Sequence, residues 1–249
     1  RLHYRAAGPA DGSLPMLFVH GWCSNLRDWE PQARAFSRRH RVVRVDLRGH
    51  GASDAPRGGY RLRTFASDVE AVARQLGVDR ALLVGHSMGG GVVLELARRA
   101  PALASGVVMV DGIVGRGRPG GEVRRHPAVA PLAGPDYRAE IERRYRAFFR
   151  PSVPRALVER VVSSAVRTPR HAALGSIRAI YRDNVRAAGL RVRAPALYIA
   201  ASTGRAGPAT IREIAPTAAF AQVVGSGHFA QLEVPRQVNE MLRSFIRGL

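Results

Sequence analysis

A serine between two glycines follows a short apolar run and precedes a glycine-rich segment. Residues 85–89 read Gly-His-Ser-Met-Gly, the pattern G-x-S-x-G, directly after the apolar run Ala81–Val84. A serine hydroxyl is a useful nucleophile only when it is exposed, oriented and next to a base. A sharp turn from a strand into a helix would expose it, and small flanking residues permit so tight a turn. The pattern therefore predicts that Ser87 is the nucleophile of an acyl-transfer reaction.

The hydropathy pattern indicates the elements that must position Ser87. Short apolar runs alternate with segments of helical periodicity, which predicts a mostly parallel sheet covered by helices on both faces. The expected strands are residues 14–20, 41–46, 81–84, 106–110, 196–200 and 220–224. The expected helices of these outer layers are residues 29–38, 64–76, 89–100 and 234–247. Thr64 is expected to cap the second of these helices, and Gly77 is expected to end it.

The alternation stops after Asp111 for about 80 residues. A loop rich in Gly, Pro and Arg, residues 112–121, opens this stretch, and no strand is evident in it. Helices are expected there at residues 137–149, 154–166 and 172–188. We therefore expect residues 112–193 to form a helical cap inserted into one α/β core, which consists of residues 1–111 and 194–249.

Four segments together resemble the α/β-hydrolase family, and the resemblance covers nearly the whole chain. In chain order they are residues 18–22 (FVHGW), 46–54 (DLRGHGASD), 84–90 (VGHSMGG) and 225–229 (GSGHF). Each segment is moderately specific, and all four in this order are highly specific. The resemblance implies an α/β-hydrolase fold, with a mostly parallel sheet flanked by helices and an inserted helical cap. It also implies a catalytic triad in the chain order Ser, acid, His.

The resemblance implies His228 as the base and leaves two positions for the acid. His228 lies in a Gly-Ser-Gly-His loop between the last expected strand and the last expected helix, at the sheet edge where sites are usually built. The commonest family position for the acid, after strand 196–200, holds Ser202 and Thr203, which cannot stabilise an imidazolium as a carboxylate does. Asp111 stands at the other position, at the end of the strand before the cap. We expect Asp111 to be the acid; the alternative is a structural Asp111 beside a Ser–His dyad.

Two backbone N–H groups are expected to form an oxyanion hole. Met88, directly after the nucleophile, supplies one donor, and Trp22, which follows His20-Gly21, resembles the second donor of the family. The single cysteine, Cys23, lies beside this loop and is interpreted as a small buried residue. One cysteine excludes an internal disulfide and a multi-cysteine metal site. No cofactor and no metal are expected.

The formal net charge of +20 is the main anomaly of the composition. The chain has 39 basic and 19 acidic residues, and every basic residue is arginine. A surface that binds nucleic acid normally combines arginine with lysine, and the arginine clusters here are short and far apart. No specific nucleic-acid partner is therefore expected. Steering of anionic substrates towards Ser87 is a hypothesis for the arginines of the expected cap, such as Arg143, Arg144 and Arg146.

The sequence also predicts where the protein acts. No run of about 18 apolar residues is present, so no transmembrane helix and no membrane partner are expected. No signal peptide is visible, which makes the cytoplasm the expected location, although the chain begins at Arg1 and its true N-terminus stays open. The oligomeric state is left open.

The expected reaction is hydrolysis of a small or medium carboxylic ester or lactone. Ser87 attacks the carbonyl, His228 takes its proton, and water releases the acyl-enzyme. A serine nucleophile argues against the branches of the family that use aspartate, the haloalkane dehalogenases and epoxide hydrolases. Two alternatives stay open: a carbon–carbon bond hydrolase with the same triad, and a ligand-binding or receptor protein with little turnover. The aromatic candidates for the pocket lining are Tyr137, Tyr145, Phe148, Phe149 and Tyr181.

Overall fold

A seven-stranded sheet forms the centre of the computed structural model, which describes residues 1–249 except Gly12, Arg116, Pro119 and Arg205. The strand order is β1-β3-β2-β4-β5-β6-β7, and neighbouring strands are parallel except β1 and β3. The mostly parallel sheet predicted from the sequence is thereby confirmed. Two residues of the expected loop 112–121, Arg116 and Pro119, lie outside the described residues.

Six of the seven strands match strands predicted from the sequence. The strands are β1 (Tyr4–Ala7), β2 (Ser13–Val19), β3 (His40–Val45), β4 (Ala81–His86), β5 (Ala104–Val110), β6 (Ala196–Ala200) and β7 (Ala218–Gln222). β1 is the strand that the sequence does not predict, because Tyr-Arg-Ala-Ala is neither an apolar run nor a regular alternation. It forms through long-range antiparallel pairing at the sheet edge, where Tyr4 pairs with Val45.

Helices cover both faces of the sheet. The helices of the outer layers are η1 (Leu26–Trp29), α1 (Glu30–Phe36), α2 (Leu62–Gln75), α3 (Met88–Arg99), α9 (Pro208–Ile214), α10 (Ala230–Glu233) and α11 (Pro235–Arg247). On β2, Met16 and Phe18 pack into the core beneath α1 and α11, whereas Leu17 and Val19 pack into the core beneath α2 and α3. This period of two is expected of a strand that is buried on both faces.

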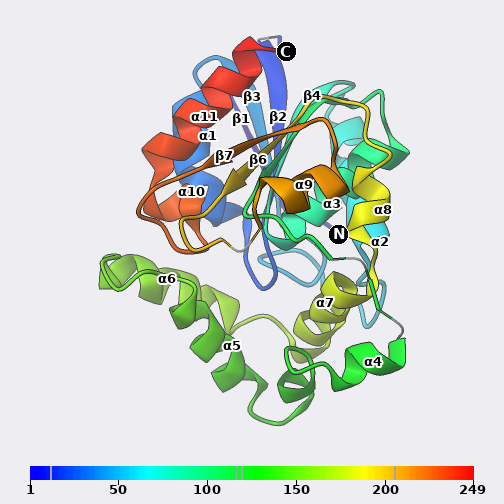
Figure 1. The fold of residues 1–249 in the computed structure, drawn as a ribbon, viewed down its shortest axis with the longest axis vertical. Helices are drawn as coiled ribbons and strands as arrows, with labels where there is room; N and C mark the ends of the chain where they lie inside the picture. Colours follow the sequence, from blue (N-terminus) through cyan, green and yellow to red (C-terminus); the bar gives the residue numbers. More distant parts are fainter. Residues whose placement is uncertain (12, 116, 119, 205) are drawn as a thin grey trace.

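Every regular element that the structure describes between β5 and β6 is a helix. The elements are α4 (Gly120–Arg125), η2 (Ala130–Ala133), α5 (Tyr137–Ala147), α6 (Arg155–Ala165), α7 (Arg170–Arg182) and α8 (Val185–Gly189). Figure 1 shows α4 to α7 grouped at one end of the molecule, beyond the sheet. α8 instead packs against α3 and α9 of the outer layers. None of the described helices combines the length and the apolar character needed to cross a membrane.

The single helix predicted at residues 172–188 is wrong, because Asp183 interrupts it. The Asp183 side chain is nearly buried and accepts hydrogen bonds from Leu62 N–H at 2.8 Å and from Arg61 Nε at 2.5 Å. α7 therefore ends at the preceding residue, and α8 begins with its own cap, the side chain of Asn184. A contact between distant segments overrides the local preference for one continuous helix.

The same carboxylate explains why the predicted cap of α2 is wrong. α2 begins at Leu62, so Thr64 lies inside its first turn and does not cap it. The free N–H of Leu62 finds its acceptor in Asp183, which lies far away in the sequence. The predicted end of the helix is confirmed, because Gly77 follows it with φ of +63°, a conformation that favours glycine.

Candidate active site

Ser87 lies on a strained turn between β4 and α3. Its φ of 51° and ψ of −117° are rare for a residue other than glycine. A Cβ atom at Gly85 would lie 2.1 Å from the carbonyl oxygen of Gly89, and one at Gly89 would lie 2.3 Å from the carbonyl oxygen of Val19. Both glycines are therefore required by close backbone approach, and the turn brings Ser87 to the wall of a pocket.

His228 and Asp111 are joined by a hydrogen bond of 2.6 Å between Nδ1 and Oδ2. Asp111 directly follows β5, which pairs with β4 and so lies beside the turn of Ser87. His228 lies in the loop after β7 and lines the same pocket as Ser87. The side chains of His228 and Asp111 are only 21% and 12% exposed, so their interaction is screened less than in water. The structure thus brings the three residues together at the carboxyl ends of the parallel strands.

The loop after β6 is packed around the carboxylate of Asp111. Ala201 N–H donates to Asp111 Oδ1 at 3.3 Å, and a Cβ atom at Gly204 would lie 2.7 Å from the same oxygen. The Ser202 hydroxyl is engaged elsewhere, since it donates to the carbonyl oxygen of Val223 at 2.9 Å. The loop after β6 therefore packs against Asp111 and presents no carboxylate of its own at Ser202 or Thr203.

Two contacts that no sequence motif signals hold the backbone of His228. His228 N–H donates to the carbonyl oxygen of Phe148 at 2.8 Å, and His86 Nε2 lies 2.9 Å from the carbonyl oxygen of His228. Burial lowers the pKa of His86 well below its ordinary value, so His86 is neutral and donates through Nε2. A Cβ atom at Gly227 would lie 2.2 Å from the Phe148 oxygen, which explains the glycine before His228.

The loop that contains Trp22 lies against Ser87. A Cβ atom at Gly21 would lie 3.2 Å from Ser87 Cβ, and Trp22 lines the same pocket as Ser87. His20 braces the loop, because its Nδ1–H donates to the Gly21 carbonyl oxygen at 2.8 Å while its Nε2 accepts another backbone N–H. Met88 is the first residue of α3, and the first N–H groups of a helix have no partner within it.

A pocket of about 210 Å³ opens beside Ser87. Apart from Ser87, His86 and His228, its walls are mainly apolar or aromatic. They include Gly21, Trp22, Ser24, Ile113, Tyr145, Phe148, Ile177, Ile180, Tyr181 and Phe229. Three of the five expected aromatic residues are present in this set. Tyr137 and Phe149 are not, and the Phe149 ring stacks on Phe229 with centroids 4.9 Å apart.

The arginines suggested for substrate steering are paired with carboxylates. Arg143 and Arg144 both bind Glu140, and Arg146 binds Glu142 and Glu159. Their charges are offset locally, so a steering role for them gains no support from the structure.

Neither a reactive thiol nor a metal cluster accompanies the pocket in the described part of the chain. Cys23 is buried, and burial raises the pKa of its thiol, which keeps it protonated and unreactive at neutral pH. Among the residues that the structure describes, no group of three or more His, Cys, Asp or Glu side chains could hold a metal ion.

Comparison with known proteins agrees with this architecture. Residues 15–235 match the family described as alpha/beta hydrolase fold. The solved structure of the enol-lactonase from Burkholderia xenovorans LB400 is similar, with a TM-score of 0.87 and 26% sequence identity. The alignment covers 99% of this chain and 96% of that chain.

Curated relatives match a shorter part of the chain. The non-heme chloroperoxidase of Streptomyces lividans is 40% identical over 114 residues, which are 45% of this chain and 41% of that protein. The 2-(acetamidomethylene)succinate hydrolase of Mesorhizobium japonicum is 42% identical over 101 residues, 40% of this chain and 36% of that protein. The chain thus spans less than half the length of these relatives. The family match covers most of the chain, and the protein therefore belongs to the α/β-hydrolase family.

Proposed function

We propose that the protein is a serine hydrolase that cleaves small carboxylic esters or lactones through an acyl-enzyme. The observation that carries the proposal is the 2.6 Å hydrogen bond between Asp111 and His228, beside the pocket that Ser87 also lines. The similarity in fold and sequence to an enol-lactonase supports it.

In the proposed reaction Ser87 attacks the carbonyl carbon while His228 Nε2 accepts its proton. Asp111 orients the imidazole through Nδ1 and stabilises the imidazolium. The backbone N–H groups of Trp22 and Met88 donate to the oxyanion, a contribution of about 10²–10³-fold in rate for a single donor. His228 then protonates the leaving alcohol, and a water that it deprotonates attacks the acyl carbon and restores Ser87.

Residues 112–193 act in this proposal as a cap on the core formed by residues 1–111 and 194–249. α7 contributes Ile177 and Ile180 to the pocket. At about 210 Å³ the pocket is smaller than the roughly 300–1,000 Å³ of sites for drug-sized ligands. The substrate is therefore a small molecule with a short, apolar acyl group, and the scheme requires no cofactor.

The size of the pocket predicts a preference for short acyl chains. Purified protein should hydrolyse p-nitrophenyl acetate and butyrate with a kcat/KM at least about 10-fold above that for the octanoate, because a long chain exceeds the available volume. Simple lactones belong in the same panel. Turnover that does not exceed the Ser87→Ala background on any of these substrates contradicts the proposed function.

The matched variant for this preference is Ile180→Ala, which enlarges the pocket without touching the triad. It should raise the ratio of octanoate to butyrate turnover about 3–10-fold. Ile246→Ala serves as the control and should leave this ratio unchanged. Ile246 lies on α11 and packs against the core that contains Met16 and Phe18, away from the Ser87 pocket. A ratio that responds equally to both variants would show that the pocket described above does not hold the acyl chain.

A second prediction concerns Tyr145, which ties the Trp22 loop to the proposed cap. Its hydroxyl donates to the carbonyl oxygen of Trp22, and the Trp22 indole N–H donates to the carbonyl oxygen of Ala173 in α7 at 2.8 Å. Tyr145→Phe removes this hydrogen bond, typically about 0.5–1.5 kcal/mol, together with the longer contact of the hydroxyl with Ser24 Oγ at 3.4 Å, and it loosens an oxyanion donor. We expect kcat for p-nitrophenyl butyrate to fall about 3–10-fold with little change in KM. Tyr137→Phe, on the same helix but outside the pocket, should have no effect.

A further inference from the structure

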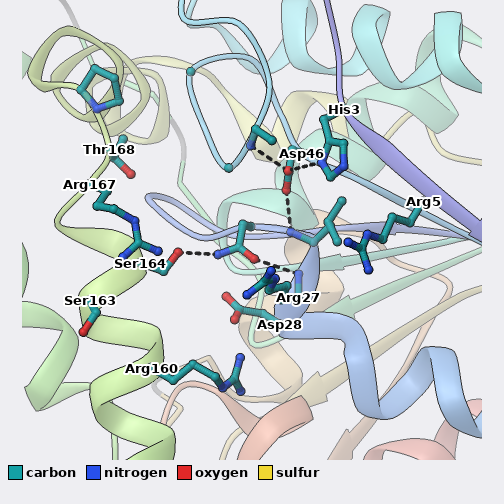
Figure 2. Close-up of a pocket in the computed structure, with 16 residues that line it drawn as sticks. His3, Arg5, Arg27, Asp28, Asp46, Arg160, Ser163, Ser164, Arg167 and Thr168 are labelled. Carbon is teal, nitrogen blue, oxygen red and sulfur yellow. Dashed lines mark hydrogen bonds and ion pairs between the residues drawn. The ribbon is translucent and has the colours of Figure 1, made fainter.

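A second cavity, of about 580 Å³, lies between η1 and α6 and shares no lining residue with the Ser87 pocket. Figure 2 shows four arginine side chains that extend towards it from separate parts of the chain. Arg5 comes from β1, Arg27 from η1, Arg160 from α6, and Arg167 from the segment after α6. The proposed cap and the core therefore both supply cationic groups to one concave site.

The convergence of these arginines is more informative than their lack of partners. With 39 basic and 19 acidic residues, many arginines in this chain must be unpaired. Within the described residues, none of the four guanidinium groups makes an ion pair or a side-chain hydrogen bond with another residue, although Arg160 interacts electrostatically with Asp28. Elsewhere in the described structure, arginines such as Arg48 and Arg98 bind carboxylates through two nitrogens.

Two carboxylates face the cavity, and one of them is already saturated. Asp46 accepts hydrogen bonds from His3 Nδ1 and Leu26 N–H, both at 2.7 Å, and from Ala52 N–H at 2.9 Å. Its oxygens are therefore engaged by the protein and are not free to bind a ligand. The cavity wall thus carries four guanidinium groups against two carboxylates, those of Asp28 and Asp46, and an excess of positive charge remains.

Asp28 presents a buried acceptor that lacks a donor. Its side chain is 2% exposed, and Oδ2 has no hydrogen-bond partner among the described residues. Burial raises the pKa of Asp28 to about 6, against the lowering effects of a hydrogen bond from Ser24 and the charge of Arg160. Asp28 is therefore mostly ionised at neutral pH, and its charge offsets part of the positive charge of Arg160.

A hydroxyl group completes the set of donors. Ser164 accepts a hydrogen bond from Asn25 Nδ2 at 2.7 Å, so its own proton is available to donate into the cavity. Ser163, exposed on the same helix, also lines the cavity.

We propose that the cavity between η1 and α6 binds a small molecule that carries a diphosphate group. Four guanidinium groups on opposite walls match two adjacent anionic groups better than one, and each planar fork can bind a phosphate through two nitrogens. The volume exceeds what a single inorganic anion fills and is in the range of sites for organic ligands.

The arginines favour a terminal phosphate group over a carboxylate ligand. A terminal phosphate group presents three acceptor oxygens and carries about −1.5 to −2 charges near neutral pH, whereas a carboxylate presents two oxygens and one charge. Guanidinium groups from the proposed cap and from the core, such as Arg160 and Arg27, can therefore bind different oxygens of the same ligand.

The test is calorimetric titration of the full chain at neutral pH and physiological salt with pyrophosphate, inorganic phosphate and citrate. Physiological salt suppresses unspecific attraction to the excess positive charge. We expect saturable one-to-one binding of pyrophosphate, at least about 10-fold tighter than that of phosphate or citrate. Arg160→Gln/Arg167→Gln should weaken pyrophosphate binding at least about 10-fold and leave hydrolysis by Ser87 unchanged.

The matched control is Arg191→Gln/Arg236→Gln, which removes the same charge from two exposed positions outside the cavity. It should change pyrophosphate affinity by less than about 2-fold. Both double variants replace exposed side chains, and an unchanged Tm verifies their folding. Equal losses in the two variants would assign the binding to net charge and overturn the proposal. Citrate binding as tight as pyrophosphate binding, or no saturable pyrophosphate binding, would also overturn it.

Discussion

Ser87→Ala is expected to lower kcat for p-nitrophenyl butyrate by about 10⁴–10⁶-fold while the protein stays folded. In a serine triad the nucleophile and its base act as a unit, so removal of one member costs nearly as much as removal of all. The turn at Ser87 has φ of 51°, which alanine adopts no more easily than serine, so the variant changes the hydroxyl and not the backbone preference. Steady-state rates and the Tm of both proteins measure the effect.

Two further measurements separate loss of the nucleophile from general damage. Ser105→Ala on β5 removes a buried hydroxyl that is outside the pocket, and it should retain activity within about 2-fold. A serine-directed sulfonyl fluoride should label Ser87 once per chain and should fail to label Ser87→Ala. Residual turnover by Ser87→Ala above about one hundredth of the wild-type rate would rule out the acyl-enzyme at this residue.

The turn at Ser87 and most of the strands could be predicted from the sequence because they depend on residues that are close together in the chain. A strand buried on both faces must be an apolar run, which is why Ala81–Val84 predicts the core of β4. Gly85 and Gly89 are required because backbone atoms lie 2.1–2.3 Å from where a Cβ would stand, and their spacing between an apolar run and a helical segment predicts the turn. Asp111 is predicted from the family resemblance, which implies two positions for the acid, and the lack of an acid directly after strand 196–200 favours the position of Asp111.

The features that could not be predicted depend on contacts between distant segments. Asp183 ends α7 because it binds Leu62, and nothing in the segment around Asp183 indicates this partner. The backbone bond from His228 to Phe148 involves a carbonyl oxygen, which every residue type carries. The cavity at η1 is another example. Arg5 and Arg160 line it together, but nothing in the sequence distinguishes them from the other basic residues among the 39.

Asp111→Asn is expected to lower kcat by about 10⁴-fold. Asn can present its NH₂ group to Nδ1 and so hold His228 in the tautomer that cannot accept the Ser87 proton, and it cannot stabilise the imidazolium. The exchange preserves size, and the variant should keep its fold. Asp79→Asn, at an exposed position between α2 and β4, is the matched control and should retain full activity.

The Asp111→Asn variant also distinguishes two roles of Asp111, the charge that it presents to His228 and the backbone conformation that it adopts in the turn. Asp111 has φ of 43°, and a residue kept only for this conformation could be replaced by Asn or Gly, both of which tolerate positive φ. The packing of Ala201 and Gly204 around Oδ1 concerns one carboxylate oxygen, while Oδ2 faces His228. If Asp111→Asn or Asp111→Gly retains more than about a tenth of wild-type kcat, the residue serves the turn and the enzyme is a Ser–His dyad. If both variants lose activity and keep the wild-type Tm, the carboxylate of Asp111 is required for the reaction.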